Sequence, residues 1–499
     1  MKTPYVMIVI LFGTLLLGGM ISASKDNSWG ILFNAPPREV LLGTAVAPYQ
    51  NGDFIVAGTE VLYRTGSQIV LCSPANLSER VWVSEVTPEG QTAWLNVYNV
   101  SGGVSDVAIT PNGSIVVVGN FGSSNSSVWV MKLNGGGRVL WARKYSVEGY
   151  VNASSVAVES DGSIILVGRA WVKASLGSGL WVMKLKSNGD VEWSRVYDER
   201  GSDGGYAVAV DANGNIVVAG TTDSFGSGYE DVWVLKLRGN GTVVWQKVYG
   251  GSSNDEARGV ALEKNGDIVV VGRTWSFGAN ITDGWILRLT PKGNVEWEKA
   301  YGGNGYNAFR SVATAPNGYV YVVGYVKNLS GEEYAWLLKL DPDGRTAWQG
   351  LFGNGSDVAN DVAVDQGAVA VVGTSFDMGM GTDSAFLLAQ GMSSKGPYFR
   401  KTALPSRSTL AEVYDSNASI ISLTPFDITS TNISVQGVGY HITVTPVHKA
   451  LPLGSPHKPQ NTTTTTNRSV CGPASIVALI LLPLLFGRLK NQKTKEEGP

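Results

Sequence analysis

The sequence predicts an all-β protein, a seven-bladed β-propeller of four-stranded antiparallel blades, and two observations lead to that fold class. A phrase with two tryptophans recurs about every fifty residues along the chain. Each repeat holds four short apolar runs separated by turn residues, and no helical periodicity competes with them. Repeated four-stranded units of this length are typical of propeller blades. The alternative, a stacked β-solenoid, would favour shorter coils and parallel pairing.

The tryptophans mark the third and fourth runs of each unit. Within each pair the second tryptophan follows the first by twelve positions, as in Trp82 and Trp94, Trp129 and Trp141, Trp181 and Trp193, Trp233 and Trp245, Trp285 and Trp297, and Trp336 and Trp348. These residues are twelve of the fifteen tryptophans in the chain. A residue present in nearly every unit is expected to hold blades together and to have no catalytic role.

The first two runs of each unit predict a hairpin. A Val-Ala pair such as Val260-Ala261 is followed by Asn-Gly or Asp-Gly, as at Asn265-Gly266, and then by an apolar run. Asn-Gly between β-branched runs predicts a type I′ turn, with positive φ at both central residues. The recurring small alanine suits inner strands that crowd together at the axis. A glycine four residues before each second tryptophan closes the other hairpin.

The glycines that end the second run give the blade count. They number seven and are Gly58, Gly119, Gly168, Gly220, Gly272, Gly324 and Gly373. The seventh unit has Phe386 in the first-tryptophan position and no second tryptophan, whereas Trp29 stands alone before the first unit. We therefore expect the strand around Trp29 to supply the outer strand of the last blade, which removes an open sheet edge.

The best-preserved unit contains YGGSSNDEARGVALEKNGDIVVVGRT and, before the next turn, a run of the type DVWVLKL. This spacing of glycine and aromatic residues resembles the SBBP-type repeat of bacterial and archaeal seven-bladed propellers. The resemblance covers about seven-tenths of the chain, residues 29–390, within an expected propeller domain of residues 25–390. It implies the fold but no particular function, because propellers host enzymes, binding modules and scaffolds alike.

Both ends of the chain carry features of a secreted, membrane-anchored protein. Residues 1–24 combine Lys2, an apolar stretch and small residues, which predicts a secretory signal peptide; an uncleaved anchor is the alternative. After a Thr-rich stalk at 461–469, the apolar segment 470–487 is slightly shorter than the ~20 residues that usually span a bilayer. The basic tail 488–499 is expected on the cytoplasmic side, which places the propeller outside the cell.

The C-terminal apolar segment begins with the letters CGP. A stalk, CGP, an apolar stretch and a basic tail together resemble the C-terminal sorting segment found in archaea of the Thermococcales. This resemblance implies anchoring at the cell surface, with Cys471 as a site of lipid attachment after processing. A tail that spans the membrane without modification stays open as the alternative.

Sequons support an extracellular setting. The candidate glycosylation sites in predicted loops or linkers are Asn76, Asn125, Asn280, Asn328, Asn417 and Asn461. The competing explanation is that Asn, Gly, Ser and Thr are favoured in turns for backbone reasons. Between propeller and stalk, residues 391–460 contain strand-like alternation and are expected to form either a small β extension or a linker.

Composition excludes whole classes of function. With 41 acidic and 39 basic residues, no net field directs the protein to nucleic acid. The three histidines all follow the propeller, so histidine-based catalysis and zinc hydrolysis on the ring are not expected. A quinoprotein-like enzyme would need a calcium-binding carboxylate cluster that is not visible. The acidic stretches 211–215 and 341–344 coincide with predicted turns, so they are not expected to bind calcium. Together, these observations lead us to expect no enzyme activity, cofactor or metal.

Candidate binding residues lie in the loops of one rim. After the strand-ending glycines come the aromatic residues Phe121, Trp171, Phe225, Trp275, Tyr325 and Phe376, one per blade in apparently equivalent positions. Blade one is irregular because 24 residues separate Gly58 from Trp82, and the insertion at 60–80 breaks the symmetry. We expect a surface-anchored module that binds a glycan, a peptide or an envelope partner. A structural envelope component without a ligand, or an extracellular enzyme, are the alternatives.

Overall fold

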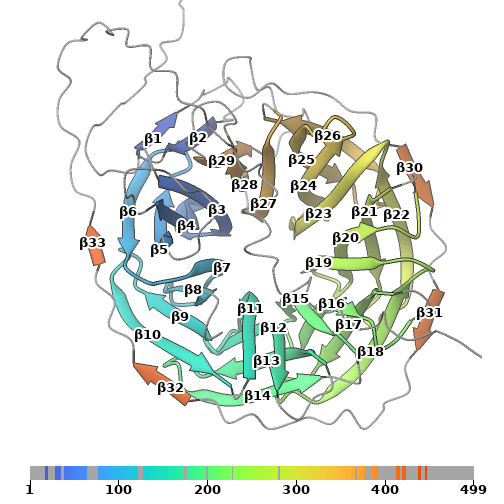
Figure 1. Cartoon of the computed structure of the whole chain (residues 1–499), viewed down its shortest axis with the longest axis horizontal. Helices are drawn as coiled ribbons and strands as arrows, with labels where there is room; N and C mark the ends of the chain where they lie inside the picture. The colour runs from blue at the N-terminus through green and yellow to red at the C-terminus, as the bar shows by residue number, and fades with distance from the viewer. Residues whose placement is uncertain are drawn as a thin grey trace, which may run out of the picture.

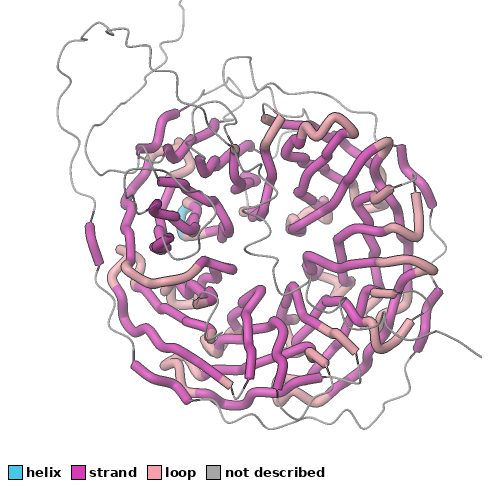
Figure 2. The backbone as a smooth tube through the Cα atoms, viewed as in Figure 1, coloured by secondary structure: helices cyan, strands magenta, loops and turns pink. Residues whose placement is uncertain are grey.

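A computed structural model shows seven four-stranded antiparallel blades arranged in a ring (Figure 1). The structure describes residues 17–20, 29–34, 39–63, 77–121, 127–147, 149–172, 177–197, 201–226, 229–278, 281–353, 355–365, 368–376, 384–391, 412–415, 419–422, 436–439 and 444–446. Nearly all of the described chain is strand and short turn (Figure 2). The predicted fold class is confirmed.

Each blade runs from an inner strand at the axis to an outer strand at the perimeter. The inner strands are β3 (Glu39–Pro48), β7 (Gly103–Ile109), β11 (Gly149–Val158), β15 (Gly204–Val210), β19 (Asp255–Leu262), β23 (Gly305–Thr314) and β27 (Asp357–Val364). The second strands are β4 (Phe54–Tyr63), β8 (Ile115–Asn120), β12 (Ile164–Val172), β16 (Ile216–Thr222), β20 (Ile268–Thr274), β24 (Val320–Asn328) and β28 (Ala368–Ser375).

The outer half of each blade carries the repeated tryptophans. The third strands are β5 (Leu77–Val86), β9 (Val128–Leu133), β13 (Gly179–Leu185), β17 (Asp231–Leu237), β21 (Asp283–Leu289), β25 (Glu333–Leu340) and β29 (Ser384–Gly391). The fourth strands of blades one to six are β6 (Thr92–Tyr98), β10 (Val139–Ser146), β14 (Val191–Tyr197), β18 (Val243–Gly250), β22 (Val295–Gly302) and β26 (Thr346–Phe352).

An N-terminal strand closes the ring, as the sequence predicts. β2 (Trp29–Asn34) pairs antiparallel with β29, with Trp29 opposite Ala389 and Leu32 opposite Phe386. The last blade is therefore made from both ends of the propeller. β1 (Leu17–Met20), which falls within the segment expected to be a signal peptide, pairs with the outer side of β2.

The repeated glycine and the first tryptophan occur together because they are cross-strand partners. Gly272 in β20 lies opposite Trp285 in β21, and Gly58 lies opposite Trp82. A Cβ atom at Gly272 would lie 1.8 Å from the carbonyl oxygen of Glu256 on the inner strand. No side chain fits there. The first tryptophans are fully buried, and Phe386 replaces them in the last blade with 1% of its surface exposed.

The second tryptophan and a tyrosine four residues later join each blade to the next. Trp245 Nε1 donates to the carbonyl of Pro291 at 3.1 Å, and the hydroxyl of Tyr249 donates to the carbonyl of Gly293 at 2.6 Å. The same tyrosine contact recurs at four other joints, with partners Tyr98 and Gly137, Tyr145 and Gly189, Tyr197 and Gly241, and Tyr301 and Gly344. The repeated phrase thus encodes the joints between blades.

The hairpin turns differ from the predicted type I′ geometry. Among the described non-glycine residues only Asn51 has a positive φ, so Asn51-Gly52 alone fits the prediction. At Asn265-Gly266 only the glycine has positive φ, and its amide donates to the carbonyl of Glu263 at 2.9 Å. This is a three-residue loop in which a type I turn is followed by a left-handed glycine. The extra residue before Asn265 sets the loop length and therefore the turn type.

Short strands from the C-terminal segment lie on the outside of the ring (Figure 1). They pair antiparallel with outer strands of blades five, four, two and one, and are β30 (Glu412–Asp415) on β22, β31 (Ser419–Ser422) on β18, β32 (Gln436–Gly439) on β10 and β33 (Val444–Pro446) on β6. They all fall within 391–460, the segment for which the sequence left a β extension or a linker open.

The expected anchor lies outside the described residues. Neither the stalk 461–469, the apolar segment 470–487 nor the tail 488–499 is described. Within the described part of the chain, no helix has the length and apolar character needed to cross a bilayer.

Candidate functional site

The two faces of the ring are built from different kinds of connection. The lower face carries the tight turns that join first to second strands and third to fourth strands. The upper face carries the loops that join blades and those that join second to third strands. Four large apolar side chains are exposed toward the upper face, namely Trp171, Tyr229, Tyr306 and Leu329. The upper face therefore exposes large apolar side chains to solvent.

Every inner strand contains a β-bulge at the same place. The register shifts between Ala257 and Gly259 in β19 and between Phe309 and Ser311 in β23, and it shifts likewise in the other five inner strands. The residues left without a cross-strand partner are Thr44, Ser105, Ser154, Tyr206, Arg258, Arg310 and Asn360. A bulge redirects one side chain without breaking the sheet. None of these seven side chains is buried.

A second set of variable residues follows the strand-ending glycines. These residues are Thr59, Asn120, Arg169, Thr221, Arg273, Tyr325 and Thr374. They lie at the upper ends of the second strands, beside the bulges. Asn120 shows the closeness, because its side-chain nitrogen donates to the hydroxyl of Ser105 at 2.8 Å.

The two sets bring four arginines together on blades three to six. We call Arg169, Arg258, Arg273 and Arg310, with Tyr206, Tyr325 and Glu256, the axial arginine cluster. The guanidinium carbon of Arg258 lies 4.4 Å from the ring centre of Tyr206 in the preceding blade. That of Arg310 lies 5.3 Å from the ring centre of Tyr325. An Nη2 atom of Arg169 donates to the hydroxyl of Tyr206 at 3.4 Å.

One buried carboxylate serves two of these arginines. Glu256 contacts Nη2 of Arg258 at 2.5 Å and Nη2 of Arg273 at 2.6 Å. Burial alone would raise the pKa of Glu256, but the two positive charges hold it below its usual value. Although burial lowers the pKa of Arg258, the charge of Glu256 raises it above the usual range. One carboxylate between two guanidinium groups leaves this part of the cluster with a net positive charge.

Arg310 has a different environment. Its Nη1 donates to the side-chain oxygen of Asn360, and among the described residues it makes no ion pair. Burial among the inner strands is the main cause that lowers the pKa of Arg310, and the charges of Arg258 and Arg273 lower it further. Solvent nevertheless reaches the side chain, which is exposed. Arg310 is a cation in a crowded, positively charged setting.

Two aspartates lie on the opposite side of the ring, one residue after their bulges. Asp361 accepts from the hydroxyl of Ser311 at 2.6 Å and from the amide of Val46 at 2.8 Å. Asp106 accepts from the hydroxyl of Ser155 at 2.8 Å and from the amide of Val156 at 2.9 Å. Burial, and then the charge of Asp361, raise the pKa of Asp106 to about 7. These carboxylates link neighbouring inner strands.

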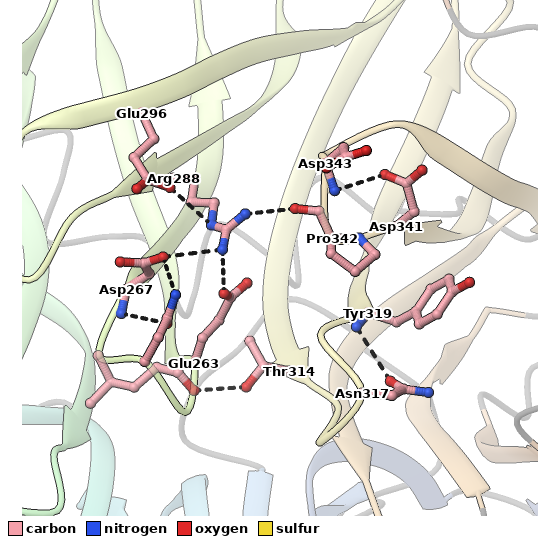
Figure 3. A network of polar contacts seen from close by, with 12 residues as sticks. Glu263, Asp267, Arg288, Glu296, Thr314, Asn317, Tyr319, Asp341, Pro342 and Asp343 are labelled. Atoms are coloured by element: carbon pink, nitrogen blue, oxygen red, sulfur yellow. Dashed lines mark hydrogen bonds and ion pairs between the residues drawn. The ribbon is translucent and has the colours of Figure 1, made fainter.

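A polar network of another kind occupies the lower face (Figure 3). Arg288 in β21 contacts Glu263 at 2.6 Å, Asp267 at 3.1 Å and Glu296 at 3.3 Å, and it donates to the carbonyl of Pro342 in the next blade at 2.6 Å. Lys184 occupies the equivalent position in blade three and contacts Glu159 at 2.8 Å. The network repeats around the ring and belongs to the joints.

The predicted rim aromatics do not share one position. Relative to the strand-ending glycine, Tyr325 is one residue later, Phe121 two, Trp171, Trp275 and Phe376 three, and Phe225 five. The expectation of equivalent positions is therefore wrong, because the loops differ in length and conformation from blade to blade.

Their environments divide these aromatics further. Phe225 packs on Trp233 at 5.8 Å between ring centres, and Phe121 packs against a buried core cluster. Trp171 is 53% exposed, and Arg273 lies 4.4 Å from the ring centre of Trp275. Phe376 is half-buried, and its amide donates to Ser356. Only Tyr325 and Trp275 contact the axial arginine cluster directly.

The remaining predicted sites fall mostly outside the described residues. Cys471 is outside, as are Asn76, Asn125, Asn280, Asn417 and Asn461. Asn328 is described, and its side-chain oxygen accepts from the amide of Glu332 at 3.0 Å within a turn. The blade-one insertion lengthens β4 and β5, and Arg80 contacts the buried Glu60 at 2.8 Å at its base. Its tip, 64–76, is not described.

The acidic turns considered for calcium use their carboxylates internally. Asp211 accepts from the amides of Asn213 and Asn215 and contacts Lys236 at 3.0 Å. Asp341 accepts from the amides of Asp343 and Arg345. Both stretches are hairpin turns, as expected. The part of the chain that the structure describes contains no group of three His, Cys, Asp or Glu residues placed to hold a metal ion.

The prediction from sequence did not include the arginines of the cluster, because it was based on the residues that recur in every blade. Arg258 and Arg310 lie just before the Val-Ala pair, and Arg169 and Arg273 lie just after the strand-ending glycine. Both positions change residue type from blade to blade, unlike the glycines and tryptophans around them. A signal existed, because a variable position at a fixed distance from an inner-strand motif must face the axis in each blade.

Comparison with known proteins assigns the chain neither a family nor a function. No protein-family model and no curated protein matches the chain. Among solved structures, a protein of unknown function from Dyadobacter fermentans is 14% identical, with coverage of 72% of this chain and 99% of that one, at a TM-score of 0.37. The polysaccharide lyase Uly1 is 10% identical, with coverage of 70% and 90%, at a TM-score of 0.43. A glucose dehydrogenase is 13% identical, with coverage of 72% and 98%, at a TM-score of 0.30.

Proposed function

We propose that this chain is a binding module displayed at a cell surface, with the propeller outside and segment 470–487 as its anchor. The apolar N-terminal stretch, the Thr-rich stalk and the basic tail support this placement. The resemblance of the CGP segment to archaeal sorting segments supports it too. Cys471 is then either lipidated or part of a spanning tail.

The observation that carries the binding role is the contrast between repeated and variable positions. The strand-ending glycines, first tryptophans and tyrosines of the repeat are buried. The bulge residues are accessible in every blade, and after the strand-ending glycines Asn120, Arg169, Arg273 and Tyr325 are accessible too, whereas threonines at that position are buried. In a ring whose scaffold is repeated, side chains that differ from blade to blade are the ones free to recognise a ligand.

The enzyme alternative would need free converging carboxylates at the axis. Asp106 and Asp361 are the candidates, but both oxygens of Asp361 accept hydrogen bonds from neighbouring strands. Asp106 is likewise engaged by Val107, Ser155 and Val156. Their geometry therefore favours a structural link over acid–base chemistry.

Two experiments test the proposal. Full-length protein in detergent, applied to arrays of glycans and peptides, should bind a restricted set of ligands. Absence of binding to arrays and to envelope extracts would favour a purely structural component. For the anchor, mass spectrometry of the C-terminal peptide decides: an unmodified Cys471 joined to the basic tail would exclude lipid processing.

A further inference from the structure

The bulge residues of blades four to seven form one continuous arc. Arg258 stacks on Tyr206 of the preceding blade, at 4.4 Å from the ring centre. Arg310 donates to Asn360 of the following blade, and Asn360 in turn donates to the carbonyl of Gly43 at 2.7 Å. Each side chain in this arc is therefore held by its neighbours before any ligand arrives. Such preorganisation lowers the entropic cost of binding.

Charge along the arc is not balanced within the protein. Among the described residues, Glu256 is the carboxylate that forms ion pairs with the arginines of the cluster, and it is shared by Arg258 and Arg273. Arg310 contacts no carboxylate among the described residues. The charge of Glu333 acts to raise the pKa of Arg310, but Glu333 contacts Lys327 at 3.7 Å. Arg310 is therefore a guanidinium near two others and has no counterion of its own among the described residues.

The orientation of Arg310 leaves donors free. Its guanidinium carbon lies 5.3 Å from the centre of the Tyr325 ring, and Nη1 donates to Asn360. Among the described residues no acceptor is hydrogen-bonded to Nε or Nη2. Stacking on an aromatic ring fixes the plane of a guanidinium while its edge stays able to donate. Two parallel N–H groups on that edge match the two oxygens of a carboxylate, phosphate or sulfate.

We propose that the axial arginine cluster binds a ligand through an oxyanion group, with Arg310 as its principal contact. Arg258 and Arg273 supply the surrounding positive field, and Trp275 and Tyr325 provide ring surface for the body of the ligand. This inference rests on the proposed binding function and specifies its ligand class. An acidic sugar and a phosphorylated sugar share the required chemistry, and the test separates them.

The test is calorimetric titration of full-length protein in detergent with glucose, glucuronate, glucose 6-phosphate and inorganic phosphate. We expect at least one anion to bind, with an affinity that falls as salt is raised, and neutral glucose to bind at least about tenfold more weakly. Arg310→Gln should weaken the anion about tenfold or more, and Arg310→Lys should weaken it less, since charge remains but the fork is lost. Arg345→Gln, at an exposed turn on the lower face, is the matched control.

The outcomes separate this inference from the function beneath it. If array ligands are neutral and bind equally to wild type and Arg310→Gln, the binding function stands and the oxyanion inference is overturned. If anions bind but Arg310→Gln and Arg345→Gln behave alike, the site is elsewhere. If neither arrays nor titrations find a ligand, both proposals fail. Melting curves of Arg310→Lys and Arg310→Gln identify any loss caused by unfolding.

Discussion

Arg288 and Arg310 lie in adjacent blades and have opposite environments. Arg288, on the lower face, contacts three carboxylates and a carbonyl of the next blade, and only 14% of its side chain is exposed (Figure 3). Arg310, on the axial side, is exposed and contacts an amide and a ring. The charge of Arg288 is neutralised by carboxylates inside the protein, whereas Arg310 has no ion pair among the described residues.

The difference shows how a repeat protein separates stability from recognition. Positions like Arg288 recur as Lys184 and Lys236 and tie turns together in several blades. Positions like Arg310 hold Thr, Ser, Tyr, Arg or Asn in the different blades, and a bulge turns them away from the sheet. Substitutions at the two kinds of position should therefore affect different measurements.

The largest expected effect is on stability, from Arg288→Met. Removing the guanidinium leaves Glu263 and Asp267, both nearly buried, without a counterion, which costs about 3–5 kcal/mol of unfolding free energy. Urea unfolding followed by tryptophan fluorescence measures the loss. Arg345→Met removes an exposed pair and should change stability by less than about 0.5 kcal/mol. Equal losses in the two variants would show that the lower-face network does not stabilise the ring.

Tyr249→Phe should have the next largest effect. The hydroxyl of Tyr249 donates to the buried carbonyl of Gly293 at 2.6 Å, so its removal costs about 1–3 kcal/mol. Tyr301→Phe is the control, because the corresponding distance to Gly344 is 3.5 Å and Lys299 also donates to that carbonyl at 2.9 Å. A larger loss for Tyr301→Phe would contradict the joint mechanism.

A pH-dependent effect on stability concerns the acidic side of the axis. The pKa of Asp106 is raised to about 7 in the folded protein, against about 3.9 for an unfolded aspartate. The folded state therefore holds a proton that the unfolded state has released, and stability falls as pH rises from about 4 to about 7. Asp106→Asn should remove that part of the slope in denaturation series across this range. Superimposable slopes for the two proteins would refute the raised pKa.

The smallest expected change in stability comes from Arg310→Gln. Arg310 makes no ion pair among the described residues, and its loss relieves repulsion from Arg258 and Arg273. Unfolding free energy should stay within about 0.5 kcal/mol of wild type. A loss comparable to that of Arg288→Met would mean that Arg310, too, is a structural residue.

The fold was predictable because the repeated residues have one structural cause in every blade. Gly272 must face Trp285, and the same pairing at Gly373 and Phe386 let the seventh blade be counted without its tryptophan. Closure by the strand of Trp29 followed from the missing fourth run. Turn type was not predictable from Asn-Gly alone, because loop length decides which residues take positive φ.

The candidate site was harder to predict because its residues lie at positions where the repeat does not fix the residue type. Arg258 precedes a Val-Ala run that recurs in every blade. Its accessibility depends on a β-bulge, and no turn residue in the sequence predicts that bulge. The aromatic residues after the glycines were noticed, but only Trp275 and Tyr325 reach the arginines. The arginines of the cluster are among the residues that differ from their counterparts in other blades at fixed positions of the repeat.

The central claim is that the ring leaves Arg310 unsatisfied so that a ligand anion can complete it. The most direct measurement is anomalous diffraction from crystals of the protein soaked in selenate, a tetrahedral oxyanion. The claim predicts a selenate, located by its selenium peak, whose oxygens lie within hydrogen-bonding distance of Nε and Nη2 of Arg310, and none there in Arg310→Gln crystals. Peaks confined to exposed arginines such as Arg345, with the edge of Arg310 bare, would contradict it.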